Sequence, residues 1–443
     1  MTTVADATTH SLPRVAVESP TRTGMALSEV AVMDRTVVAY LSSYGLSMLG
    51  NSVAAVVLPL VVLQTTGAAL GAGAVAAATA IPAVLAGVFM GGVIDRVHRR
   101  SASIVTDLVS AAAVAALPMV DLVGDLSVGW FVTFGIIGSF GDVPGLTARE
   151  ALLPQITAQN IISADRLVGL RESLGAIVML AGPAAAAGLV TAVDGATALW
   201  VTAALSLAAA LTTFAIPREV GAVAATGGGV KTGKNPASVA IEQLREGWTF
   251  LFLRSRFLLT VTIVNLVLVS TLAALQGLLL PVHFTATGEQ GQLGLVLSAM
   301  GVGLLLGSVA LTALHARMTR RTWFVTGLVG SVAGIGVVAN FPPVIWVFAG
   351  AVVLGLGGGV VSTLLGVLMN ERIPDAMRGR VTGTQNAVLT GAPSVGVLGA
   401  AVLVDTKSLA TAGVVVTAVW TAAVAGALLA PALRDLAPRT SYQ

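Results

Sequence analysis

Long stretches of this chain carry no Asp, Glu, Lys or Arg, and their lengths constrain the fold more than any other feature of the sequence. The longest runs from Thr36 to Ile94, and the others are 195–217, 257–288, 290–316, 322–370 and 381–404. A helix needs about 20 mainly apolar residues to cross the hydrocarbon core of a bilayer. Each stretch is therefore long enough for one transmembrane helix, and the two longest are long enough for two.

The composition excludes a soluble globular protein. Charged residues make up 10% of the 443 residues, whereas soluble domains carry about 25%. Apolar residues make up 56%, and the mean hydropathy is +0.91. A single core could not enclose so much apolar surface behind so few charges. The lipid bilayer is therefore expected to surround most of the chain.

Twelve candidate spans result when the apolar stretches are divided at proline, glycine and polar residues. They are 37–63, 67–94, 102–120, 127–150, 164–191, 196–216, 257–282, 291–315, 322–339, 343–370, 380–404 and 408–431. The runs are continuously apolar, whereas barrel strands would alternate over about ten residues. We predict an all-α membrane protein with twelve transmembrane helices in two pseudo-symmetric six-helix bundles.

Polar segments divide the twelve spans into two sets of six. The predicted order is a disordered cytoplasmic tail, a first bundle, a cytoplasmic linker, a second bundle and a second cytoplasmic tail, at 1–35, 36–216, 217–256, 257–432 and 433–443. The linker contains three consecutive glycines and two lysines within 225–236, a composition typical of flexible connections.

Basic residues predict the orientation. If the spans alternate and both termini are cytoplasmic, Lys407 is the only one of the 24 Lys and Arg residues in an outer loop. This distribution satisfies the positive-inside rule. We predict a multi-pass protein of the bacterial inner membrane with both termini in the cytoplasm. The basic charge is explained by topology, and no nucleic-acid partner is expected.

The two halves contain a repeat with an offset of 221 residues. Asp95-Arg-Val-His-Arg-Arg100 follows the second span, and Ala316-Arg-Met-Thr-Arg-Arg321 follows the eighth. At the same offset, Arg149-Glu150 matches Asn370-Glu371. Two related bundles with a site between them are typical of an alternating-access transporter.

The segment Gly91-Gly-Val-Ile-Asp95-Arg96-Val-His98-Arg99-Arg100 resembles the signature loop of the major facilitator superfamily, with His98 in place of the usual glycine. Other segments resemble the drug-proton antiporter branch, as in actinobacterial tetracycline and aminoglycoside efflux pumps and related macrolide and siderophore exporters. These segments are 58–67, 147–154, 181–188 and 377–381. Gly182 and Pro183 resemble the antiporter motif, although alanines replace its usual glycine pair at 186 and 187.

The signature loop predicts a gate at the cytoplasmic side. The Asp95 carboxylate would cap the start of the eleventh helix near Arg380, where exposed amides favour a negative charge. The resemblance also implies that Asp95 pairs with Arg149. The predicted gate residues are Gly91, Asp95, Arg96, Arg99, Arg100, Arg149 and Arg380. For Arg99 and Arg100, a purely topological role is an equal alternative.

Three acids within the spans are candidates for proton coupling. Asp142 and Glu172 are the first choices, and Asp107 lies nearer the cytoplasmic side. Intramembrane carboxyls are usually functional, but many are paired. The alternative is that Asp142 with Arg149, or Glu172 with Arg171, forms a structural ion pair.

The substrate site is expected between the bundles, where polar residues interrupt apolar helices. The candidates are Tyr44, Asn51, Asn265, Gln276, Gln385 and Asn386. For any one of them, a packing role is the alternative. The chain has no cysteine, and its four histidines are scattered, so we expect no metal and no cofactor.

These patterns together predict a non-enzymatic, proton-coupled exporter of small drug-like molecules that acts as a monomer. Two alternatives remain at this point. The chain could instead export a dedicated siderophore, lipid or metabolite, or serve as a receptor or scaffold without transport.

Overall fold

The computed structural model describes residues 35–94, 97–158, 162–221, 245–373, 377–434 and 436. Within these ranges, all regular structure is helical, and twelve spans are long and apolar enough to cross a membrane. The predicted all-α fold is confirmed. Most of each predicted tail and most of the predicted linker lie outside the described residues.

The first six spans are α2 (Arg35–Thr66), α3 (Ala69–Ile94), α4 (Arg99–Val123), α5 (Val128–Thr157), α6 (Ala164–Ala192) and α7 (Gly195–Phe214). The seventh span comprises α9 (Arg256–Ala274), the π-helical turn η3 (Leu275–Leu279) and α10 (Leu280–Ala286). The last five spans are α11 (Gln290–Leu314), α12 (Arg320–Val338), α13 (Val344–Arg372), α14 (Arg378–Thr406) and α15 (Leu409–Leu429). The largest difference from the predicted bounds is at α5, because Arg149 and Glu150 end the apolar run without ending the helix.

Side chains in the turns cap several helix starts. The Asp194 carboxylate accepts a hydrogen bond from the Thr197 amide at 2.6 Å, and the Ser408 hydroxyl accepts one from the Thr411 amide at 3.1 Å. These caps satisfy amides that the first helical turn leaves without partners. The hydrogen bonds from Thr197 also hold the pKa of the Asp194 carboxyl below its usual value.

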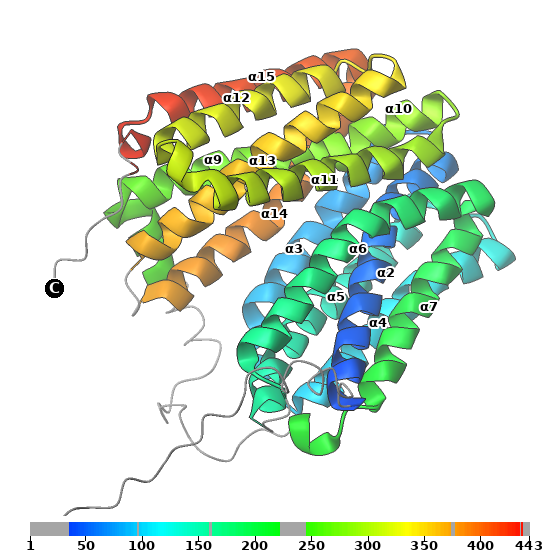
Figure 1. Cartoon of the computed structure of the whole chain (residues 1–443). Helices are drawn as coiled ribbons and strands as arrows, with labels where there is room; N and C mark the ends of the chain where they lie inside the picture. The colour runs from blue at the N-terminus through cyan, green and yellow to red at the C-terminus, as the bar shows by residue number, and fades with distance from the viewer. Residues whose placement is uncertain are drawn as a thin grey trace, which may run out of the picture.

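Two bundles pack side by side (Figure 1). The first bundle comprises α2 to α7 and the second comprises α9 to α15. They meet along two pairs of helices, α3 with α14 and α6 with α11. Small residues allow close approach within and between the bundles. A Cβ atom at Gly303 of α11, for example, would overlap the Val352 carbonyl of α13.

The helices alternate in direction, so the structure has two distinct ends. The end at which α2 begins and α7 finishes is called the basic end, because the arginines gather there. The opposite end is called the loop end and contains the turns 67–68, 124–127, 193–194, 287–289, 339–343 and 407–408.

The sequence repeat has a structural counterpart at the basic end. Arg99 donates a hydrogen bond to the Ala151 carbonyl at 3.3 Å, which links the start of α4 to α5. At the offset of 221 residues, Arg320 donates two hydrogen bonds to Glu371 at 2.8 and 2.9 Å, which link the start of α12 to α13. Equivalent arginines therefore join equivalent helices in the two bundles.

The Arg320–Glu371 pair predicts a small pH-dependent contribution to stability. The hydrogen bonds from Arg320 lower the pKa of Glu371, so the stabilisation is present above the unfolded-state value, about 4.3, and is lost as the pH falls through the folded-state value. Both side chains are about one-third exposed. We expect Glu371→Gln to lower the free energy of unfolding by at most about 1 kcal/mol at pH 7.

Unfolding in detergent at pH 7 and at acidic pH measures this effect. Glu289→Gln in the turn before α11 is the control. A difference between wild type and Glu371→Gln that grows on acidification would contradict the prediction.

Candidate functional site

A cavity of about 340 Å³ lies between the bundles. Helices α2, α6, α9, α11, α13 and α15 line it, together with η3, and its lining includes Ser52, Val56, Met179, Gln276, Met300 and Trp420. The lining is mainly apolar, and the Gln276 amide donates to the Met300 sulfur at 3.5 Å. Methionine side chains adapt to ligands of varied shape, and tryptophan offers a large apolar face. This inter-bundle cavity suits a small amphipathic molecule.

The predicted cavity residues occupy different places. Of the six, Gln276 lines the inter-bundle cavity, and Asn51 lines a second cavity inside the first bundle. Gln385 is buried and donates to the Thr262 hydroxyl at 3.5 Å, whereas Asn386 is exposed. Tyr44 is buried beneath the Arg171 guanidinium, and Asn265 is half-buried. Neither cavity has Tyr44, Asn265, Gln385 or Asn386 in its lining.

Met179, Met300 and Trp420 were missed by sequence reasoning. Apolar residues in an apolar helix carry no local sign that they face a cavity, since the rotation of the helix decides this.

An ion pair is buried where α4 and α5 meet. Arg149 donates to the Asp107 carboxylate, and each side chain is 4% exposed. Arg149 also donates to the Ser43 hydroxyl at 3.3 Å, and Ser47 donates to Asp107 at 3.4 Å. Among the described residues, Asp107 is the partner of Arg149. The pairing of Asp95 with Arg149, which the resemblance implies, stays a prediction. Asp95 and Arg96 lie outside the described residues.

Asp142 lies two helical turns from Arg149 on α5, in the direction of the loop end. Its carboxylate accepts a hydrogen bond from the Ser110 hydroxyl of α4 at 2.6 Å. A side chain at Gly141 would overlap Ser110, so this glycine allows the close approach of α4 and α5. The structure shows no ion pair for Asp142 with any described residue. The alternative that Asp142 pairs with Arg149 is therefore wrong, because Asp107 occupies that guanidinium.

Glu172 has a different environment from Asp142. Its side chain is 64% exposed and accepts from Arg171 at 2.5 Å, and Glu150 approaches the same arginine at 3.6 Å. The structure therefore supports the alternative of an Arg171–Glu172 ion pair. A carboxylate held by the arginine next to it is less suited to take up and release a proton than one without an ion pair.

The other predicted gate residues lie at the basic end. Gly91 is in the last turns of α3. Arg100 donates to the Phe214 carbonyl at 2.8 Å, so it holds α4 against α7, and Arg99 contacts α5 as described above.

Arg380, at the start of α14, pairs with Glu246 at 2.6 Å. Glu246 lies just before the π-helical turn η2 (Thr249–Arg254). Each of these contacts joins two residues of the same half of the chain.

Gly182 and Pro183 lie where α6 contacts both bundles. A Cβ atom at Gly182 would overlap Ser52 of α2, and one at Gly294 of α11 would overlap the Pro183 carbonyl. The motif therefore lets α6 pack closely on its own bundle and on the opposite one. Pro183 also lines the inter-bundle cavity.

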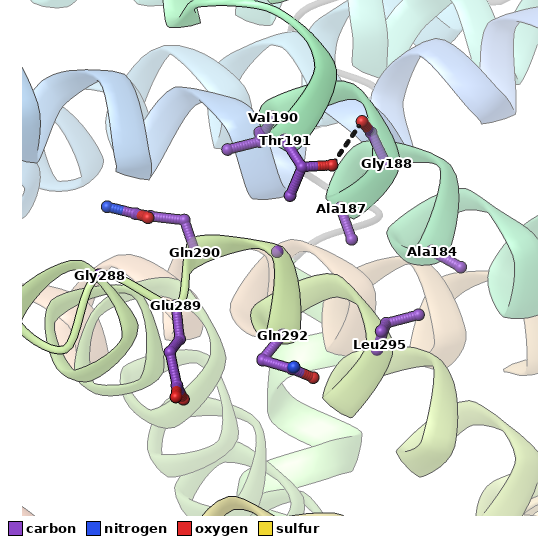
Figure 2. A pocket seen from close by; sticks show the side chains of 11 residues that line it. Ala184, Ala187, Gly188, Val190, Thr191, Gly288, Glu289, Gln290, Gln292 and Leu295 are labelled. Carbon is purple, nitrogen blue, oxygen red and sulfur yellow. Dashed lines mark hydrogen bonds between the residues drawn. The ribbon is translucent and has the colours of Figure 1, made fainter.

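Asp405 joins the bundles at the loop end. Its carboxylate, near the end of α14, accepts hydrogen bonds from the Ala69 and Leu70 amides at the start of α3, at 3.2 and 2.9 Å. Figure 2 shows another contact between the bundles at this end, where Ala187 and Thr191 of α6 lie opposite the start of α11. A helix start favours a negative charge. The structure is therefore closed at the loop end by a cap that crosses the bundle interface, a role for Asp405 that sequence reasoning missed.

We expect Asp405→Ala to weaken this closure. Loss of the two amide hydrogen bonds at an exposed helix start should cost about 1–2 kcal/mol, which corresponds to roughly a tenfold shift toward loop-end opening. Spin labels on Asp125→Cys and Lys407→Cys can report the separation of the bundles, because the chain has no native cysteine. Asp121→Ala, another exposed carboxylate at this end, is the control. Identical distance distributions with and without Asp405→Ala would refute this role.

Two six-helix bundles around a shared cavity define the architecture of a secondary transporter. The family model of the Major Facilitator Superfamily matches residues 40–396, and it matches 266–442 again. The chain belongs to this superfamily, as the signature loop predicted. The family and the fold indicate a multi-pass membrane transporter and not an enzyme.

Relatives with assigned names cover most of the chain. A protein named multidrug efflux pump Tap from Mycolicibacterium fortuitum is 29% identical over 363 residues, which cover 81% of this chain and 87% of that protein. The protein of the same name from Mycobacterium tuberculosis (strain ATCC 25618 / H37Rv) is 29% identical over 399 residues, or 88% and 92% of the two chains.

Solved structures share the fold at low sequence identity. The nucleoside transporter NupG has a TM-score of 0.70 at 13% identity and covers 89% of this chain and 98% of its own. An inward-facing bacterial homologue of the iron transporter ferroportin has a TM-score of 0.61 at 16% identity. The match covers 88% of this chain and 98% of the homologue.

Proposed function

We propose that this protein exports amphipathic drug-like molecules across the bacterial inner membrane in exchange for protons. The observation that carries the proposal is the 29% identity to multidrug efflux pumps over 88% of the chain. The similarity covers 88% of the chain, so it includes residues of both bundles.

The inter-bundle cavity supports the substrate class. Its volume of about 340 Å³ is in the range of small-molecule sites, and its lining is mainly apolar. Gln276 and Ser52 supply a few hydrogen-bonding groups. Such a surface binds molecules by shape and apolar contact and discriminates weakly among them, which is the behaviour of a multidrug pump.

The arrangement of acids supports Asp142 as the proton carrier. The guanidinium of Arg149 neutralises Asp107, and Arg171 pairs with Glu172. Among the described side chains, only the Ser110 hydroxyl forms a hydrogen bond with Asp142. A hydroxyl can donate to a carboxylate and accept from a carboxylic acid, so Ser110 can serve both protonation states.

The distribution of arginines supports the orientation. Lys407 is the only basic residue in the turns of the loop end, so the positive-inside rule favours a cytoplasmic basic end and cytoplasmic termini. The structure, closed at the loop end, would then correspond to a state that is closed to the outside.

Flux into proteoliposomes tests the function. We expect tetracycline, used as the probe, to accumulate against its gradient when a pH gradient is imposed, and a proton uncoupler to abolish the accumulation. Competition by a panel of drugs, siderophores and lipids then separates a multidrug pump from a dedicated exporter. Absence of pH-driven flux for the whole panel would refute the proposal.

A further inference from the structure

A second cavity lies entirely within the first bundle. It has a volume of about 250 Å³ and is enclosed by α2, α3, α4, α5 and α7, without any residue of the second bundle. We call it the first-bundle cavity. Its polar lining comprises Asn51, Thr79, Ser110, Ser139, Asp142, Thr202 and Ser206. Asp142 is the only charged residue in this lining.

Helix α2 is the wall between the two cavities. Asn51, Ala54 and Leu58 line the first-bundle cavity, whereas Ser52, Ala55 and Val56 line the inter-bundle cavity. Successive residues of an α-helix point about 100° apart, so the neighbouring residues Ala54 and Ala55 face different cavities. The same helix contacts the buried ion pair through Ser43 and Ser47.

We propose that the coupling proton and the drug occupy separate chambers on the two sides of α2, and that they influence one another through this helix without direct displacement. The inference rests on the proposed function for the identity of the transported species. It adds the location of the proton site and the type of coupling.

The first-bundle cavity has the properties of a proton-binding chamber. A polar cavity of this volume has room for several water molecules, each of which needs two or more polar partners. Within the described residues, the Asn51 side chain has no protein hydrogen-bond partner, so it can bind such a water. In the proton step, the Asp142 carboxylate takes one proton from a hydronium ion, which becomes water, and the carboxyl group is then neutral. It returns the proton to a water molecule when the transporter changes state.

Charged groups from the surrounding helices do not block this role. Asp107 of α4 and Arg149 of α5 interact electrostatically with Asp142, but they are paired with each other. No charged side chain of α2, α3 or α7 lines the cavity. Toward the loop end the lining is apolar, with Val62, Leu117 and Phe131 all buried. Apolar side chains therefore close the cavity on its loop-end side.

The dependence of drug affinity on pH distinguishes separate chambers from a shared one. With a shared site, the apparent Kd for tetracycline should rise about tenfold per pH unit on acidification, without limit. With separate chambers, the Kd should reach plateaus at both ends of the range, separated by a finite factor of about 5–150. The Asp142→Asn variant should show one pH-independent Kd. A continuous rise without a plateau would overturn the proposal.

A variant that fills the chamber provides the second measurement. Gly138 lines the first-bundle cavity and has room for a side chain, since the nearest atom to a Cβ there is 3.8 Å away. We expect Gly138→Leu to retain tetracycline binding and lose pH-driven flux. Gly169→Leu, at an open position on α6 of the same bundle, is the matched control and should retain both. Loss of binding in folded Gly138→Leu, or unchanged flux, would overturn the proposal.

These outcomes remain distinct from failure of the proposed function. Wild-type protein without pH-driven drug flux would refute proton-coupled export itself. Wild-type flux together with a Kd that never reaches a plateau would refute only the separate chambers.

Discussion

Replacing Asp142 by asparagine is expected to reduce pH-driven drug efflux to background while the protein remains folded. Asparagine has nearly the same shape, and its side-chain oxygen can still accept the hydrogen bond from Ser110, which is 2.6 Å from the carboxylate in the wild type. It cannot exchange a proton at physiological pH. The change therefore removes the proposed proton site and preserves the contact between α4 and α5.

Two transport modes separate coupling from structure. Efflux driven by a pH gradient requires net proton movement, whereas exchange of labelled for unlabelled drug does not. We expect Asp142→Asn to lose the first and keep the second. Asp121→Asn, an exposed carboxylate near the end of α4, should keep both. Loss of exchange as well would assign Asp142 a structural role, and unchanged pH-driven efflux would remove it from the mechanism.

The second large effect is expected at Arg149. Arg149→Met leaves the Asp107 carboxylate buried without its partner, because both side chains are 4% exposed. Removing one member of a buried ion pair typically costs 3–5 kcal/mol, and we expect a loss of about this size in the free energy of unfolding. Chemical unfolding of the purified protein in detergent measures the loss.

Removal of both charges tests whether the unpaired buried carboxylate causes the loss of stability. The double variant Arg149→Met with Asp107→Asn should recover much of the lost stability, since no unpaired charge then remains buried. Arg317→Met, at an exposed position between α11 and α12, is the control and should change stability little. An equal loss in the single and double variants would show that packing, and not charge, is responsible.

Much of the architecture was predictable because its signals are local. Length and hydropathy predict a span wherever about 20 apolar residues occur together, regardless of the rest of the chain. The predicted end of α5, at residue 150, was too early because it also relied on this local signal. Charges at 149 and 150 end the apolar pattern, but Arg149 is paired inside the bundle, so the helix continues to Thr157.

The functional site was less predictable because it depends on the rotation of each helix about its axis. Asp142 was identified as a candidate from its position in a span, and the structure places it beside Ser110 in the lining of the first-bundle cavity. Glu172 had the same sequence signal, yet its carboxylate is paired with Arg171. The two acids differ in which neighbour their helix face meets, and hydropathy alone does not contain that information.

The sequence by itself determined that the chain spans a membrane twelve times and has two related halves, and its signature loop indicated the superfamily. These properties follow from runs of neighbouring residues and from a repeat along the chain. Only the tertiary structure decided that Arg149 pairs with Asp107, that Asp405 caps α3 from α14, and that α2 separates two cavities. Each of these relationships joins helices that are distant in sequence, and it depends on angles and distances between helices that no single segment encodes.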